Sequence, residues 1–315
     1  MTASKAQSIG RRQFLGAAAA ALAEGTLSCQ PTWASPTTIF KSSSLEALVL
    51  SDGHFVLPID FLVTPDAPPV EREAALKSAG HGGTQIQLVN NVCVIRSQSA
   101  VILVDAGAGP RHQPTAGKLL DNLKAAGIEP SAVTQVVLTH GHPDHLWGIL
   151  DANDNLVYPH ASYVVSAAEW SVWGDPDVMG KMPTVLANAR VVNGAKNHFS
   201  RIKDKVRTVR NGDEIMSGVR VIDTPGHTPG HMSVELEGGD GLIIAGDVLT
   251  HMVISFQHPS WRVPVDHEAD RGVSTRLRLL DRLATGKGRL LGAHLPFPGT
   301  GFVERKDGAY RFVAG

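Results

Sequence analysis

Four side chains that commonly bind metal ions lie within six residues, in the segment Thr139-His140-Gly141-His142-Pro143-Asp144-His145. Neutral imidazoles beside an ionised carboxylate suit Zn²⁺ or a similar borderline ion. A His-rich surface turn is the other interpretation, but this dense arrangement of ligand types is uncommon in such turns. The segment therefore predicts a metal site, and we expect it to hold two ions.

The residues on either side of this segment indicate how it is held. Residues 135–138 are apolar and β-branched, which predicts a buried strand that ends at Thr139. The ligands would then lie on the loop at the C-terminal end of a strand, where α/β sheets place their chemistry. Residues 146–150 predict a short helical turn, so the loop would be fixed at both ends.

The pattern His-x-His-x-Asp-His resembles the metal-binding motif of the metallo-β-lactamase-fold hydrolases. The match covers roughly residues 45–315, and four further segments follow the family's pattern in order: 101–109, 223–231, 245–247 and 292–294. Within the family, the opening Asp52-Gly53-x-Phe55 and the tail at residues 292–299 look most like the methyl parathion hydrolase group. The resemblance implies an α/β fold, an αββα sandwich.

The resemblance also implies the metal ligands. One ion would be held by His140, His142 and His227, the other by Asp144, His145 and His294, and Asp247 would bridge both. The expected cofactors are two divalent transition ions, Zn first, with Mn, Co or Fe as alternatives. His231 fits a ligand position too, but the family uses the first His of such a segment, so His231 is expected behind it. Asp105 either orients the ligand loops or simply caps its own turn.

The chemistry expected from two such ions is hydrolysis. A metal-bridging hydroxide would attack an ester-like bond of a small molecule: a phosphotriester, an aryl ester or a lactone. The catalytic residues would be Asp247, which bridges the ions, and Asp144, which either accepts the hydroxide's proton or acts only as a ligand. No Gly-x-Ser-x-Gly nucleophile context is present.

Two alternatives within the same fold remain. Acyl-homoserine lactone lactonases carry a Tyr shortly after the bridging Asp, whereas residues 248–251 here are Val-Leu-Thr-His. Thiol or persulfide redox members bind one iron and often lack ligands of the second site, so the full set of seven argues against them. The sequence therefore favours aryl esters and phosphotriesters over lactones.

The expected substrate pocket is formed by His112, Trp147, Trp173 and Phe256. Residues 167–201 are rich in large apolar side chains and are expected to roof the site, with packing on the core as the alternative. His112 stands where the parathion hydrolases present an aromatic residue, which speaks against a purely arene-binding pocket.

Composition and the N-terminal residues bear on location and partners. With 315 residues, 43% hydrophobic, the chain can bury a large core as one enzyme domain, expected at residues 35–315. A net charge of −1 gives no case for nucleic acid binding. Arg11-Arg12 followed by Phe14-Leu15 and an Ala-rich run predicts a twin-arginine export signal over residues 1–34.

The export signal would bring the chain to the twin-arginine machinery and then to the periplasm or the medium. Cleavage after Ala34 would remove Cys29 and leave Cys93, expected as a buried strand thiol, without a disulfide partner. A homodimer is left open.

Hydrophobic periodicity predicts strands alternating with helices, as in α/β folds. Strands are expected near residue 48 and over 86–95, 101–104, 135–138, 162–165, 219–222, 232–236 and 242–245, and helices over 116–126, 167–173 and 269–284.

Overall fold

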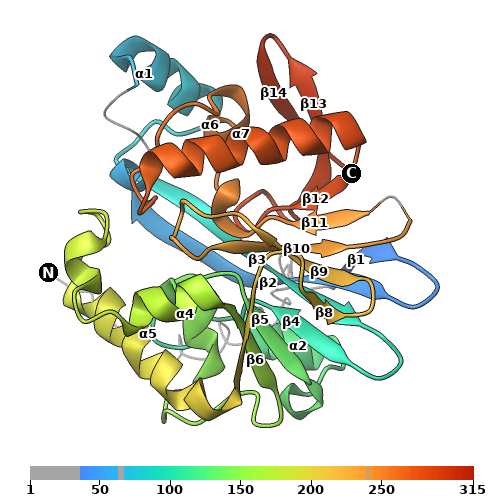
Figure 1. Cartoon of the computed structure of the whole chain (residues 1–315). Coiled ribbons are helices and arrows are strands. Elements are labelled where there is room, and N and C mark those ends of the chain that lie inside the picture. Colours follow the sequence, from blue (N-terminus) through green and yellow to red (C-terminus); the bar gives the residue numbers. More distant parts are fainter. Residues whose placement is uncertain (1–35, 63–66, 240) are drawn as a thin grey trace, which may run out of the picture. The chain divides into compact units, whose positions relative to one another are not determined.

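Short runs of Val, Ile and Leu form the central strands, which are buried on both faces, and all strands assemble into two sheets (Figure 1). This computed structural model describes residues 36–62, 67–239 and 241–315. The first sheet has the order β1-β2-β3-β4-β5-β6-β7. Its strands are β1 (Thr37–Lys41), β2 (Glu46–Pro58), β3 (Gln85–Arg96), β4 (Val101–Val104), β5 (Gln135–Leu138), β6 (Ser162–Ser166) and β7 (Val206–Val209).

The second sheet has the order β14-β13-β12-β11-β10-β9-β8. Its strands are β8 (Glu214–Met216), β9 (Val219–Asp223), β10 (Met232–Leu236), β11 (Leu242–Ile244), β12 (Arg289–Leu291), β13 (Thr300–Lys306) and β14 (Ala309–Ala314). Strands β4 to β7 pair in parallel, as do β11 and β12. The other pairs are antiparallel.

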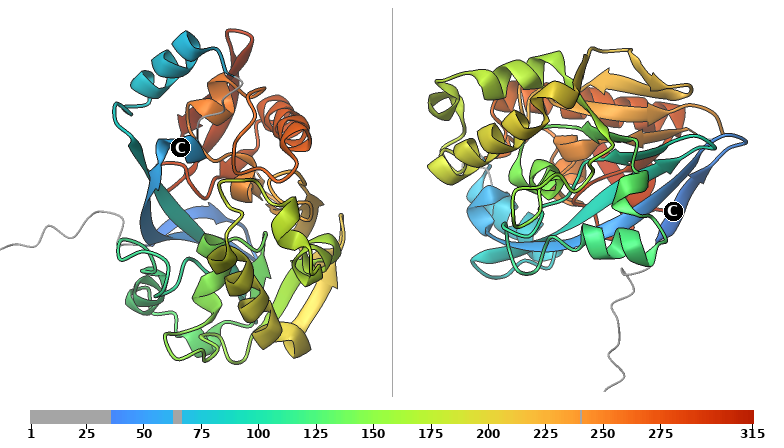
Figure 2. Two further views of the ribbon diagram at one scale, coloured as in Figure 1. Left: turned by 90° about the vertical axis from the view of Figure 1, so that its left-hand side faces the viewer. Right: turned by 90° about the horizontal axis from the view of Figure 1, so that it is seen from below.

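Helices cover the outer faces of both sheets (Figures 1 and 2). Helices α2 and α4 contact the first sheet, and α6 and α7 contact the second. The helices are α1 (Pro69–Ser78), α2 (Leu119–Ala125), α3 (Pro143–Leu146), α4 (Ala167–Gly174), α5 (Ala189–Ile202), α6 (Ile254–Gln257) and α7 (Ala269–Gly286). The expected αββα sandwich is confirmed.

The core has one layer between the sheets and one under each set of helices. Strand β4 shows why, because successive side chains of a strand point to opposite faces. Ile102 and Val104 pack between the sheets, whereas Leu103 packs under the helices of the first sheet. On the second sheet, Ile243 and Leu290 pack against the apolar stripe of α7.

The expected strands and helices form, with one boundary moved. The helix expected over 116–126 begins only at Leu119. Gly117 has a φ of +71°, a left-handed conformation that cannot continue into a helix. The buried carboxylate of Asp52 then accepts the Leu119 amide N–H at 2.9 Å, where the helix starts. The sequence did not predict β1, β7, β8, β12, β13, β14, α1, α5 or α6.

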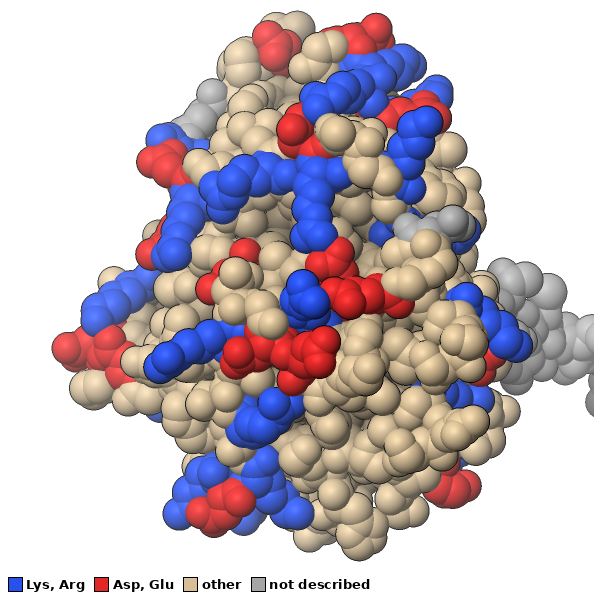
Figure 3. All heavy atoms as spheres, turned by 45° about the vertical axis from the view of Figure 1, so that its right-hand side comes forward, with Lys and Arg blue, Asp and Glu red and all other residues tan. Residues whose placement is uncertain are grey.

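Four observations bear on location, redox state and surface charge. The predicted export signal, including Arg11-Arg12 and the cleavage point, lies outside the described residues. Within the described part of the chain, no helix is both long and apolar enough to cross a membrane. Cys93 lies buried in β3 with a free thiol. On the face in Figure 3, the described Lys and Arg side chains are interspersed with Asp and Glu.

Candidate metal centre

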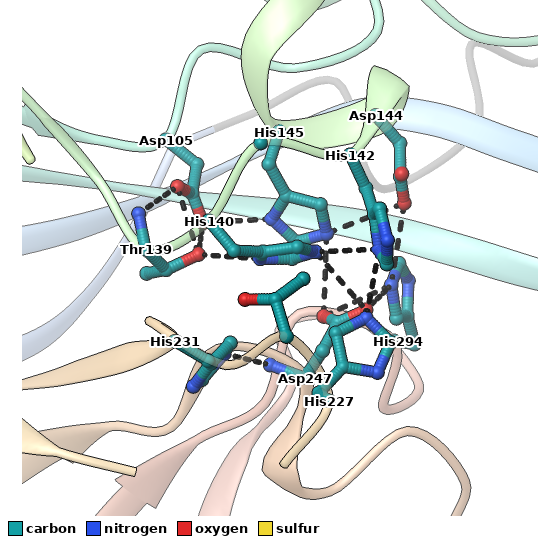
Figure 4. A network of polar contacts seen from close by, with 12 residues as sticks. Asp105, Thr139, His140, His142, Asp144, His145, His227, His231, Asp247 and His294 are labelled. Atoms are coloured by element: carbon teal, nitrogen blue, oxygen red, sulfur yellow. Dashed lines mark hydrogen bonds and ion pairs between the residues drawn. The ribbon is translucent and has the colours of Figure 1, made fainter. Parts of the chain in front are cut away.

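Four loops bring the predicted ligands together, and their side chains converge in Figure 4. The loop after β5 carries His140 to His145, and the β9–β10 connection carries His227. Asp247 lies in the turn η7 (Gly246–Val248) after β11, and His294 follows β12. Because β5, β11 and β12 all present their C-terminal ends here, residues more than 150 positions apart meet at one edge.

One cluster consists only of imidazoles. The Nδ1 atom of His142 lies 3.0 Å from His140 Nε2 and 2.9 Å from His227 Nε2. Three converging ring nitrogens cannot all be satisfied by protons shared among themselves, whereas a cation satisfies all three. Burial lowers the pKa of His140 and His142 well below the ordinary value, so both rings are neutral, the form in which imidazole binds a metal.

The second cluster has two imidazoles and two carboxylates. His145 Nε2 lies 3.3 Å from Asp144 Oδ2 and 3.2 Å from Asp247 Oδ1. His294 Nε2 lies 3.4 Å and 3.2 Å from the same two oxygens. Ligand bonds of about 2.0–2.1 Å in a tetrahedral site place neighbouring donor atoms about 3.3 Å apart. The four His–Asp distances match that value, and all four donor atoms lie within 4.8 Å of one another, close enough to hold one ion.

Asp247 faces both clusters. Its Oδ1 atom points at His145 and His294, and its Oδ2 atom lies 3.2 Å from His227 Nε2. Buried within ion-pair range of each other, His145 Nε2 and Asp247 Oδ1 nevertheless make no hydrogen bond to any described residue. Burial raises the pKa of Asp247, but the facing imidazoles of His294, His145 and His227 hold it well below the usual value. Asp247 in turn raises the pKa of the same three imidazoles, so the site favours positive charge around this carboxylate, which two transition ions would supply.

Each of the five imidazoles uses its remaining ring nitrogen to fix its orientation. The partners are Thr139 Oγ1 for His140 (3.0 Å), His267 Nε2 for His142 (3.1 Å), Asp105 Oδ2 for His145 (2.8 Å), Asp266 Oδ1 for His227 (3.0 Å) and the Val89 carbonyl for His294 (2.8 Å). The rings are thus held in place by the protein itself, so the donor atoms converge without needing an ion to order them.

Asp105 and His231 support the cluster from behind. Asp105 has a φ of +66° and accepts the Thr139 N–H at 2.8 Å, so its carboxylate joins His145 to the start of the ligand loop. This geometry favours an orienting role over a simple turn cap. His231 Nε2 accepts the backbone N–H of Asp247 at 3.0 Å and points away from the converging donors.

Two buried carboxylates near the ligands were not predicted. Glu169 on α4 accepts the Gly141 N–H (2.8 Å) and the Thr228 hydroxyl (2.6 Å), so it joins the two loops of the imidazole cluster. The pattern Ser166-x-x-Glu169, with Ser166 capping α4, was a local signal for this position. Asp266 lies in a loop and pairs with the buried Arg276 of α7 at 3.2 Å, and nothing in its local sequence marks it.

A cavity of about 260 Å³ opens above the two clusters. His142, Asp144, His227, Asp247 and His294 form its floor. The walls are largely apolar and are lined by Phe55, Leu57, Phe61, Leu62, Leu88, Val185, Leu186, Val191 and Val265, with His112, Gln113, Asn188, Arg190 and Thr250 as the polar positions.

Of the four expected pocket residues, only His112 lines this cavity. Trp147 lies behind His112 and stacks on His198 with ring centroids 5.6 Å apart. The Trp173 ring packs on Gly141 and donates its indole N–H to Glu169 at 2.7 Å. Phe256 is fully buried in the core under the second sheet, against Phe312. These three aromatic rings belong to the hydrophobic core. A large ring loses as much contact with water in the core as in a pocket wall, so its size alone did not decide between the two.

The segment 167–201 contributes to the cavity, but through other residues than expected. Trp170, Trp173, Met182 and Phe199 belong to or pack against the core under the helices, and Met179 is 39% exposed. The lining residues come instead from the start of α5 and the turn before it, at residues 185–191.

A family model described as the metallo-beta-lactamase superfamily matches residues 86–291. The chain is 26% identical to the Xenopus laevis metallo-beta-lactamase domain-containing protein 1 over 214 residues, 66% of this chain and 74% of that protein. It is 28% identical to the Bacillus subtilis protein YobT over 158 residues, 50% of this chain. The matches span 60% of YobT and 66% of a Mycobacterium leprae relative, less than two thirds of each.

Solved structures extend the likeness over most of the chain. The dizinc quorum-quenching lactonase AidC, solved with the product N-hexanoyl-homoserine, superposes with a TM-score of 0.82 and 27% identity over 89% of this chain and 97% of that one. The hydrolase AbOPH of the beta-lactamase superfamily gives a TM-score of 0.81 and 29% identity with the same coverage. The chain therefore belongs to the metallo-beta-lactamase superfamily.

Proposed function

We propose that this protein hydrolyses an ester-like bond of a small, uncharged and largely apolar substrate. It would use two divalent transition ions, with Zn as the first candidate. The observation that carries the proposal is the shared position of Asp247. Its two oxygens face two separate ligand clusters, and both clusters open into one cavity. A single-ion redox protein would not need the second cluster of four donors.

His140, His142 and His227 would hold one ion, Asp144, His145 and His294 the other, and Asp247 both. When bound, two such ions activate water and polarise the substrate oxygen as Lewis acids. Asp144 has a second role open to it, because its Oδ2 atom faces His145 and His294 while Oδ1 has no partner among the described residues. At 18% exposure it is the most accessible carboxylate of the centre, and Oδ1 would take up the proton that the attacking water releases.

The walls of the cavity support the substrate class. Apart from the ligands, Arg190 is the one charged residue among the described residues that line it, and most of the remaining surface is apolar. Apolar walls bind aryl or alkyl groups, and a few polar positions orient them. At the position three residues after Asp247 the cavity is lined by Thr250 rather than by a Tyr. We therefore rank aryl esters and phosphotriesters first and retain the methyl parathion hydrolase group as the proposed subgroup.

Lactone opening is the second candidate. Its support is the likeness to the dizinc lactonase AidC, which covers 89% of this chain. A lactone carbonyl would meet the same clusters, so the two candidates differ in the walls and not in the centre. Acyl-homoserine lactones therefore belong in the same substrate panel.

One purified sample tests the proposal. Elemental analysis should give about two ions per chain, and a chelator should abolish hydrolysis until Zn²⁺ or Mn²⁺ is returned. Loaded protein should cleave aryl esters or paraoxon-type phosphotriesters faster than acyl-homoserine lactones. Faster lactone opening would reverse the ranking, whereas one iron per chain with thiol or persulfide turnover would replace hydrolysis by the redox alternative.

We further propose that residues 1–34 direct export through the twin-arginine machinery and that residues 35–315 form the mature periplasmic or secreted enzyme. Replacing Arg11 and Arg12 by Lys should leave the precursor in the cytoplasm. Normal appearance of the mature form in the periplasm would contradict the proposal.

A further inference from the structure

We infer that the substrate carries a second oxygen acceptor, a carbonyl or nitro group away from the scissile bond, and that the His112 imidazole N–H binds it. The inference rests on the proposed function, because it concerns the same cavity. His112 lines that cavity but belongs to neither ligand cluster. It would therefore determine which esters bind productively, and it would take no part in the reaction itself.

The ring of His112 is held in one orientation by two aromatic neighbours. Phe55 contacts it edge to face with centroids 5.2 Å apart, and Trp147 does so at 5.7 Å from a second direction. Its Nδ1 atom is buried and has no hydrogen-bond partner among the described residues. A buried N–H without a partner is rarer in proteins than a buried acceptor without one, so the proton of the neutral ring belongs on Nε2.

The Nε2 atom is then the donor left for a ligand. No described residue hydrogen-bonds to it, and it is not among the buried polar atoms without partners. Burial lowers the pKa of His112, which keeps the ring neutral at neutral pH. A neutral donor in an apolar wall favours a neutral acceptor, because an anion would lose more hydration than one such bond returns.

The backbone around His112 is fixed from both sides of the cavity wall. Gln113 makes two hydrogen bonds to the backbone of Val56, at 3.0 and 3.2 Å. Arg190 donates to the carbonyls of Arg111 (2.7 Å) and His112 (3.2 Å) while its guanidinium lies over Trp147. A donor on such a fixed loop loses little conformational entropy when a ligand binds. Most of the free energy of its hydrogen bond therefore contributes to the binding affinity.

Most other polar side chains of the wall are already used. Gln113 is engaged with Val56, and Asn188 caps α5 by accepting the Val191 N–H at 3.0 Å. Thr250 has a buried hydroxyl without a partner, but its neighbour Asp247 places it beside the reacting groups. His112 is thus the unpaired donor of the wall that belongs to neither ligand cluster and lies on a different loop from Asp247.

Matched ligands test this inference on the metal-loaded protein. The substrates are the butanoate esters of 4-acetylphenol and 4-ethylphenol, which have similar shape but differ in one carbonyl. For each ester, kcat/KM of wild type is divided by that of His112→Phe, so the reactivity of the leaving group cancels. The ratio should be about tenfold larger for the acetylphenyl ester, the loss expected for one neutral hydrogen bond. His112→Gln, whose amide nitrogen replaces Nε2, should restore much of it.

Binding of the two free phenols, measured by calorimetry, separates this inference from the proposed function. If the esters are not cleaved but wild type still prefers 4-acetylphenol and His112→Phe does not, the inference stands and the proposed hydrolysis falls. Equal ratios for both esters, or equal binding of both phenols, would overturn the inference. A preference for a 4-carboxyphenyl ester that Arg190→Met abolishes would also overturn it in favour of anion binding. The exposed His160, changed to Phe, is the matched control and should alter neither ratio.

Discussion

Replacement of Arg276 by Met should both destabilise the fold and weaken the metal centre. Arg276 is 2% exposed and donates to the carbonyls of Val248 (3.3 Å), Pro259 (3.1 Å) and Trp261 (2.7 Å). It also pairs with Asp266, whose other oxygen orients His227. Met keeps much of the volume but removes the charge, so the buried Asp266 carboxylate would lose its guanidinium partner and keep only the imidazole of His227.

The magnitude follows from these contacts. Breaking a buried ion pair by removing one partner costs about 3–5 kcal/mol, and the three carbonyls that lose their donor place the loss toward the upper end. For a domain of this size, about 2 °C of Tm corresponds to 1 kcal/mol, so Tm should fall by about 6–10 °C. Because Asp266 holds His227, metal affinity should also fall about 10–100-fold.

The two effects are measured separately. Urea and thermal unfolding of metal-free protein give the structural loss, since a bound ion would add its own stabilisation. Competition with a chelator then gives the metal affinity. Arg278 lies on the same helix with an exposed side chain, so Arg278→Met is the matched control and should stay within about 0.5 kcal/mol of wild type. Equal unfolding midpoints for the two variants would refute the reasoning.

Three further outcomes are expected. Glu169→Ala leaves the Gly141 N–H without its acceptor and should lower the ion occupancy to about one per chain, measured by elemental analysis. Glu169→Gln keeps an acceptor and should retain two ions. Equal occupancy in both variants would speak against the loop-joining role. Asp247→Ala should lose both ions and His231→Ala should keep both at saturating Zn²⁺, and the reverse order would exchange their roles. Burial raises the pKa of Asp52 from 3.8 to about 6, so ionisation costs more in the folded state. The stability that Asp52 contributes is full only below its unfolded pKa of about 4 and is lost as pH rises from there through 6. The advantage of wild type over Asp52→Ala in urea unfolding should therefore shrink by about 2 kcal/mol between pH 4 and 7. An advantage that grows with pH would contradict this sign.

The sequence alone determined the features that local pattern encodes. Each short apolar run followed directly by His, Asp or Gly predicts a buried strand and a loop at its C-terminal end, so the local pattern suffices to place Asp144 and Asp247 at a sheet edge. The fold class followed in the same way from the alternation of strands and helices and from the family resemblance. Strands β13 and β14 escaped prediction because they carry many exposed side chains and lack a continuous apolar run.

Only the tertiary structure decided which side chains face the cavity and which support the ligands. The periodicity of apolar residues predicts that Trp173 and Phe256 are buried. A core and a pocket wall bury an aromatic ring equally well, so the local sequence cannot tell which of the two places a ring occupies. Asp266 gains its role from His227 and Arg276, which lie 39 and 10 residues away along the chain. Such a role depends on distances between distant segments, and those distances exist only once the two sheets have packed.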